Sequence, residues 1–245
     1  MVFCFLNSFS RWNKNNHDFT KRIFAKSTYI FQENSNPEIA EGQMSYMRNK
    51  FKFYGVKAPG WIVFSKEIMK SEDVFHNKKL KEFVRLCLKE EHREIHYFAL
   101  QMVERTTKKE EENFIKFLEE LIVTHSWWDT VDWITKMVGW HFMRFPKKVK
   151  LVTGKWLASK NIWLQRTAII FQRYKNYPTN EKMMFDYILR MKDSKEFFIQ
   201  KGAGWALREH SKTEPEAVIQ FIKNNRLALL TKREGMKWMK KKGIL

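Results

Sequence analysis

The chain has 245 residues, and 46 lysines and arginines against 27 aspartates and glutamates give it a formal net charge of +19. The hydrophobic fraction of 44% excludes a disordered basic tail, and the charge predicts an anionic partner, either nucleic acid or an anionic membrane surface. With only 9 glycines and 5 prolines, a sandwich or barrel of many short strands is excluded and a mostly helical chain is expected.

Residues 1–33 mix aromatic and polar side chains without a clean period, so we expect an N-terminal extension that is either flexible or a loosely docked helix. Its apolar start is too short for a signal peptide, and no stretch is long and apolar enough to span a membrane. A soluble, cytoplasmic protein is therefore expected, nucleoid-associated if it comes from a bacterium. Residues 34–245 are expected to form one domain.

Apolar residues recur at helical spacing through the rest of the chain. Asn36 followed by Pro37 is typical of a helix start, and residues 57–60 are expected to separate two helices. Capping-box patterns predict further helix starts at Ser126, Thr213 and Thr231, and a related pattern predicts one at Asp193. The predicted helical segments are 79–104, 112–124, 127–143, 161–174, 181–191, 195–210, 215–224 and 231–242.

A sequence repeat runs through the second half. The segment from Trp163 to Ala168 aligns with Phe198 to Ala203, with Gln165 matching Gln200 at an offset of 35, and Trp128 aligns with Trp163 at the same offset. A period of about 35–40 residues with two helices per unit is typical of HEAT or armadillo solenoids. We therefore predict an all-α superhelix whose concave, basic face could hold DNA.

Common catalytic motifs are missing from the sequence: there is no phosphate-binding loop and no nucleophile elbow. His92 and His96 have metal-like spacing, but a solvated helix face explains them better, and we expect no metal and no cofactor. Two cysteines, Cys4 and Cys87, provide neither a disulfide framework nor a zinc site, and we expect one exposed and one buried thiol.

Three places resist a purely structural explanation. Trp128 and Asp132 lie one helical turn apart, and a carboxylate among aromatic side chains is costly unless it is paired or functional. Arg166 follows one repeat later, where it could bind a phosphate or pair with Asp132. Trp205 follows two glycines inside a predicted helix, which suggests a close approach by a neighbouring helix or a ligand. The alternatives are a core aspartate bonded to the next repeat and a Trp205 that only fills the core.

These residues resemble the AlkD-type DNA alkylation repair glycosylases, which are built of HEAT-like repeats. The resemblance runs from about residue 34 to residue 241. It is carried by five stretches of sequence and by the Tyr46 helix. The five stretches are Leu118–Asp132, Asn161–Arg166, Lys195–Lys201, Gly204–Glu209 and Thr231–Glu234.

The resemblance implies that Asp132 is the catalytic carboxylate, with Arg166 beside it and Trp128 and Trp205 facing the lesion nucleotide. It implies further DNA contacts at Tyr46, Arg208, Lys232 and Arg233. The implied enzyme is a monomeric, monofunctional glycosylase acting on 7-alkylguanine and 3-alkyladenine in double-stranded DNA, and the lesion is thought to stay largely stacked. The alternatives are a non-catalytic solenoid that binds nucleic acid or a protein, and a protein that binds anionic membranes. The last lacks a strongly basic amphipathic helix with an exposed apolar face.

Overall fold

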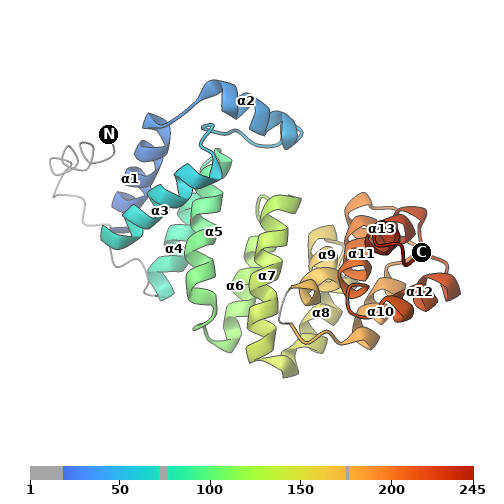
Figure 1. Ribbon diagram of the computed structural model, residues 1–245. Helices are drawn as coiled ribbons and strands as arrows, with labels where there is room; N and C mark the ends of the chain where they lie inside the picture. Colours follow the sequence, from blue (N-terminus) through green and yellow to red (C-terminus); the bar gives the residue numbers. More distant parts are fainter. Residues whose placement is uncertain (1–18, 72–76, 175–176) are drawn as a thin grey trace. The chain divides into compact units, whose positions relative to one another are not determined.

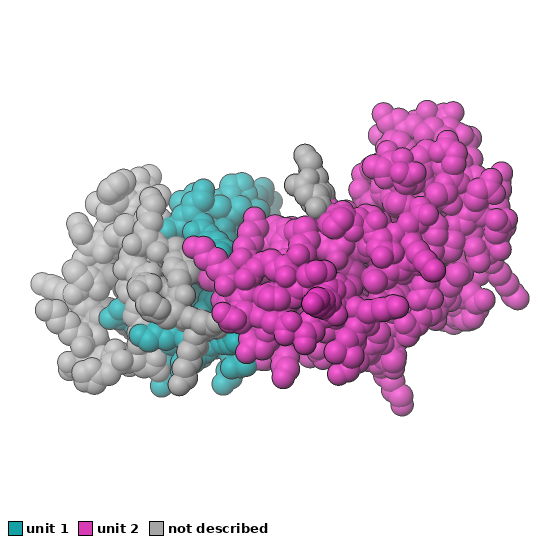
Figure 2. Space-filling view, turned by 90° about the horizontal axis from the view of Figure 1, so that it is seen from below, with its two compact units in different colours: residues 1–105 teal, residues 106–245 magenta. Residues whose placement is uncertain are grey.

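The computed structural model describes residues 19–71, 77–174 and 177–245, and these residues form thirteen α-helices and no strand (Figure 1). Two compact units divide the chain, residues 1–105 and residues 106–245, and Figure 2 shows each in its own colour. Cys4 lies outside the described residues, whereas Cys87 is buried. None of the described helices is both long and apolar enough to cross a membrane.

Unit 1 contains the first four helices and nearly all of the fifth. They are α1 (Phe19–Glu33), α2 (Pro37–Tyr46), α3 (Ala58–Ser71), α4 (Asn77–Cys87) and α5 (Arg93–Thr107). In the described part of the extension, α1 packs against α3 and α4. Its Ile23 and Phe31 side chains are completely buried, so this helix is part of the core of unit 1.

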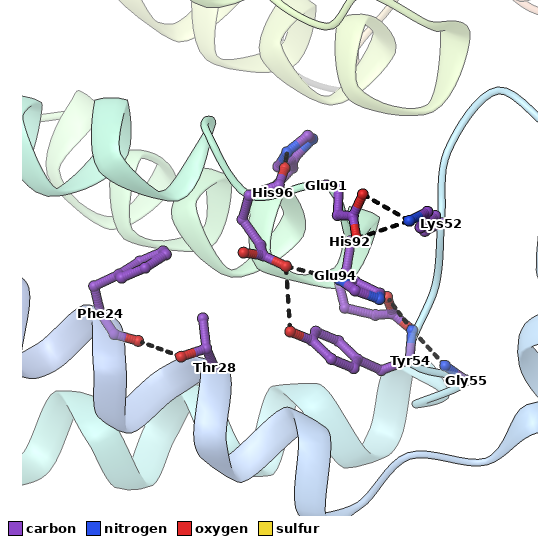
Figure 3. A network of polar contacts seen from close by, with 10 residues as sticks. Phe24, Thr28, Lys52, Tyr54, Gly55, Glu91, His92, Glu94 and His96 are labelled. Carbon is purple, nitrogen blue, oxygen red and sulfur yellow. Dashed lines mark hydrogen bonds and ion pairs between the residues drawn. The ribbon is translucent and has the colours of Figure 1, made fainter.

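The loop after α2 is fastened to α5 by a buried carboxylate. Glu94 accepts hydrogen bonds from three consecutive backbone amides, those of Tyr54, Gly55 and Val56, at 3.1, 2.9 and 3.1 Å. Figure 3 shows Glu94 with Tyr54 and Gly55. The Tyr54 ring stacks on His92, with 3.9 Å between the ring centroids. The prediction that the two histidines lie on a solvated helix face is wrong, because His96 is buried and contacts the Glu90 carbonyl oxygen at 2.7 Å.

Unit 2 is a stack of helix pairs. It contains α6 (Ile115–Val123), α7 (Trp128–Arg144), α8 (Val149–Ala158), α9 (Ile162–Ile170), α10 (Glu181–Arg190), α11 (Phe197–His210), α12 (Pro215–Asn224) and α13 (Leu229–Lys241). Helix α7 contacts α9, α9 contacts α11 and α11 contacts α13. Helix α6 packs on α7 and α9, α8 packs on α9, and α12 packs on α11 and α13. Short 3₁₀ helices join some of them, among them η5 (Phe171–Arg173) before α10.

The sequence repeat has a structural cause. The side-chain amide of Gln165 donates to the carbonyl of Ser159, and that of Gln200 donates to the carbonyl of Ser194, at 2.6 and 2.9 Å. Both the donors and the acceptors are offset by 35 residues (200 − 165 and 194 − 159), so each glutamine ties its helix to the preceding loop in the same way. The predicted all-α repeat architecture is confirmed.

Two predicted helix boundaries are wrong. Segment 79–104 is not one helix, because α4 ends at Cys87 and the chain turns before the Arg93 N–H donates to the carbonyl of Lys52 at 2.9 Å. Residues 57–60 do not separate helices, since α3 begins at Ala58 with Pro59 in its first turn, where a missing N–H costs nothing. Helix α8 was not predicted.

The predicted capping boxes are wrong as caps. The Thr213 hydroxyl donates to the His210 carbonyl, and the Ser126 hydroxyl donates to the Ile122 carbonyl. Helix α13 begins at Leu229, two residues before Thr231, whose hydroxyl donates to the carbonyl of Gln200 on α11. The helix start predicted at Asn36 and Pro37, by contrast, is confirmed: α2 begins at Pro37, and the Asn36 side-chain oxygen caps it by accepting from the Ile39 N–H at 3.0 Å.

Candidate active site

The centre of the candidate site is an ion pair between neighbouring helices of unit 2. Asp132 on α7 receives two hydrogen bonds from Arg166 on α9, from Nε to Oδ1 and from Nη2 to Oδ2, each 2.9 Å long. The Arg166 side chain is 5% exposed and the Asp132 side chain 14%. Planar two-point pairing fixes the orientation of a carboxylate as well as its charge. The sequence left two roles open for Arg166, and the structure shows the pairing with Asp132.

Local structure holds Arg166 in place. Asn161 caps α9 by accepting the N–H groups of Trp163 and Leu164, which fixes where the helix begins. The remaining terminal nitrogen of Arg166, Nη1, donates to the carbonyl of Phe198 at 2.7 Å. A Cβ on Gly202 would approach that nitrogen to 3.0 Å, so the absence of a side chain there leaves room for the guanidinium.

A second arginine, which the sequence analysis did not single out, lies beside this pair. The guanidinium carbon of Arg173, in η5, is 3.4 Å from the centroid of the Trp205 ring and 4.0 Å from that of Tyr174. The Tyr174 hydroxyl donates to the backbone carbonyl of Asp132. Burial raises the pKa of Tyr174, so this hydroxyl keeps its proton and remains a donor. Burial likewise lowers the pKa of Arg173, and the positive charge of Arg166 adds to that effect.

The aromatic residues singled out from the sequence do not all lie in the same unit. Trp205, on α11, is half-buried, and its indole N–H donates to Glu209 at 3.3 Å. Trp128 is the first residue of α7, one turn before Asp132, and is also half-buried. Tyr46 ends α2 in unit 1 and is 69% exposed. The structure therefore brings Asp132, Arg166 and Trp205 together in unit 2, and it places Tyr46 in the other unit.

The basic residues expected to contact phosphates lie on two helices, α11 and α13. Arg208 on α11 donates to Glu234 on α13 at 3.0 Å, and Lys201 binds the other oxygen of the same carboxylate at 3.0 Å. Lys232 is half-buried and Arg233 exposed near the start of α13. The sequence analysis included Lys201 and Glu234 in the matching stretches but gave them no role, although Lys201 lies seven residues (208 − 201), two helical turns, before Arg208. No cluster of three or more potential metal ligands occurs among the described residues.

The comparison with protein families bears on what this site does. A family model described as DNA alkylation repair enzyme matches residues 28–239. The chain belongs to that family. The match starts within the described part of the N-terminal extension and reaches the last helix. The resemblance to alkylation repair enzymes stated from the sequence is thereby confirmed.

Solved structures agree with the fold of this member of the DNA alkylation repair enzyme family. A protein from Enterococcus faecalis, titled a predicted DNA alkylation repair enzyme, is 29% identical, with a TM-score of 0.78, over 84% of this chain and 97% of its own. AlkD2 from Streptococcus mutans is 18% identical, with a TM-score of 0.58, over 81% of this chain and 97% of its own, and supports the fold alone. No curated protein sequence matches significantly.

Proposed function

We propose that this DNA alkylation repair enzyme is a monofunctional DNA glycosylase that releases 7-alkylguanine and 3-alkyladenine from double-stranded DNA. The observation that carries the proposal is the Asp132 carboxylate, which Arg166 holds at two points while part of it stays exposed. Trp205 adds an aromatic face within reach of the same arginine, since the Arg166 guanidinium carbon is 5.9 Å from its ring centroid.

The chemistry requires little from the protein beyond this arrangement. An alkyl group on N7 of guanine or N3 of adenine gives the base a positive charge, which makes it a good leaving group without protonation. As the glycosidic bond breaks, positive charge develops on the sugar around C1′. A carboxylate beside that atom stabilises the developing charge and orients the attacking water, as carboxylates do in glycoside hydrolysis. The reaction needs no metal and no cofactor.

Arg166 has a defined part in this proposal. Its guanidinium fixes the plane of the Asp132 carboxylate, and its third hydrogen bond to Phe198 ties the pair to α11, the helix that carries Trp205. The tryptophan face attracts a cationic base or the sugar beside it. The enzyme then acts as a monomer on duplex DNA, and the excess of 19 positive charges attracts the phosphate backbone to a basic groove.

The test is product analysis with the full-length protein. Incubation with duplex DNA methylated at guanine N7 should release free 7-methylguanine and leave the strand unbroken until it is heated in alkali, because no lysine nucleophile takes part. A duplex of the same sequence without methylation should release no base. Tight binding of methylated duplex with no free base above the spontaneous rate would refute the glycosylase and favour a non-catalytic DNA-binding solenoid.

A further inference from the structure

Two cations flank Trp205 along one face of α11. Lys201 lies four residues before Trp205 and Arg208 three residues after it, spacings that place all three side chains on the same side of a helix. With a rise of about 1.5 Å per residue, Lys201 lies about 6 Å and Arg208 about 4.5 Å from Trp205 along the helix axis. A nucleotide at Trp205 would therefore have a positive charge on either side.

One carboxylate from the next helix holds both cations. Glu234 on α13 receives the Lys201 ammonium at Oε1 and the Arg208 guanidinium at Oε2, each at 3.0 Å. Burial works to raise the pKa of Glu234, but hydrogen bonding to Lys201 and the charges of Lys201, Arg208 and Lys237 more than offset it, so the pKa is lowered. Lys237 is exposed one turn further along α13.

The backbones of α11 and α13 approach closely beside Glu234. A Cβ on Gly204 would come within 2.5 Å of the Glu234 Cβ and 2.9 Å of the Thr231 carbonyl oxygen, so only glycine allows this approach. The Thr231 hydroxyl adds a hydrogen bond to the carbonyl of Gln200 at 3.1 Å. Glu234 is therefore held at a fixed distance from the Trp205 helix.

The charges around Glu234 do not balance. Lys201, Arg208 and Lys237 bring three positive charges to one carboxylate, which leaves an excess of two. The Lys201 and Arg208 side chains remain 37% and 24% exposed, so they can still accept a second anion. Glu209, whose carboxylate accepts the Trp205 indole N–H, is itself paired with Lys212 at 2.6 Å.

We propose that Lys201 and Lys237 join Arg208 in a binding site for backbone phosphates on either side of the nucleotide at Trp205, with Glu234 as the positioning residue that spaces the three cations. This inference rests on the proposed function for the identity of the ligand. Phosphodiesters fit because they are single negative charges repeated along a strand next to stackable bases, whereas the site offers cations on both sides of one aromatic face.

The experiment measures binding of an undamaged duplex across a range of salt concentrations, so it does not depend on base release. Lys201→Gln and Lys237→Gln should each weaken binding. Each should also make the fall of log K with log salt shallower by about 0.9, the contribution of one phosphate contact. The matched control is Lys195→Gln, which removes an exposed lysine just before α11 and should leave the slope nearly unchanged. An unchanged slope in Lys201→Gln and Lys237→Gln would overturn the site.

A second variant separates a specific contact from the net charge of the protein. Lys201→Gln combined with Glu234→Gln restores the original net charge, yet the proposed phosphate contact stays lost, so the slope should stay below that of the unmodified protein. Recovery of the full slope in this double variant would mean that Lys201 only neutralises Glu234, and the proposal would fall. If the unmodified protein and the variants show the expected salt slopes but the unmodified protein releases no base from methylated duplex, the proposed function fails and the phosphate site stands.

Discussion

Two carboxylates, one in each unit, show how differently this fold holds an acidic side chain. Glu94 in unit 1 is completely buried, and both of its oxygens are taken by backbone amides of the loop it fastens. Asp132 in unit 2 is bound by a single guanidinium and keeps part of its surface exposed. The first can only build structure, because nothing else can reach it. The second is oriented but can still meet a substrate.

The largest expected effect on stability comes from Glu94. Glu94→Ala leaves three N–H groups, two of them buried, without their acceptor, at about 1–3 kcal/mol for each buried group, so the free energy of unfolding should fall by about 3 kcal/mol. The control is Glu91→Ala, which removes a solvent-exposed ion pair with Lys52 and should leave the free energy of unfolding nearly unchanged. Urea denaturation compares the two, and equal losses would contradict the role given to Glu94.

His141 lies on the same helix as Asp132 and should make the stability of the protein depend on pH. Burial, with a contribution from the Arg144 charge, lowers the pKa of His141 to about 4, whereas the unfolded chain has a value of about 6.5. The folded state thus favours neutral histidine, so this contribution is complete above about pH 6.5 and is lost as the pH falls towards 4. Between pH 8 and pH 5, the free energy of unfolding of the unmodified protein should fall by about 2 kcal/mol more than that of His141→Leu. An equal difference in both would show that His141 is not held neutral.

Arg166→Lys tests whether the orientation of Asp132 matters or only its charge. Lysine keeps the positive charge but cannot bind both carboxylate oxygens and the Phe198 carbonyl at once. We expect stability to fall by about 1–3 kcal/mol and the single-turnover rate of 7-methylguanine release to fall by at least about tenfold. A rate equal to that of the unmodified protein would mean that a nearby positive charge is sufficient.

Gly204→Ala probes the crossing that positions Glu234. The added methyl would clash with α13, which costs about 1–3 kcal/mol in a packed interior. Gly154→Ala on α8 is the matched control, because nothing lies within 4 Å of its added Cβ and alanine favours a helix. Thermal unfolding should show a loss for the first variant and no loss for the second. A Gly204→Ala protein as stable as its Gly154→Ala counterpart would remove the argument for a fixed crossing.

The repeat and the Asp132 segment could be predicted because they depend on local spacing. Gln165 and Gln200 stand out at an offset of 35 since each makes the same bond to its preceding loop. The capping boxes failed because other carbonyl groups compete for the same hydroxyl groups. Thr213 and Ser126 bond to carbonyls of the preceding turn, whereas Thr231 bonds to α11. Arg173 was missed because its importance comes from contact with Trp205, 32 residues away (205 − 173), which no local pattern reveals.

The most direct test of the central claim is the single-turnover rate of 7-methylguanine release by Asp132→Asn at saturating enzyme. The matched control is Asp186→Asn, which makes the same change at an exposed position on α10. We predict that Asp132→Asn still binds the duplex and that its rate falls by about 10²–10³-fold or more, since the charge that stabilises the sugar cation is gone. The control should keep the rate of the unmodified protein. Full activity in Asp132→Asn would contradict the account.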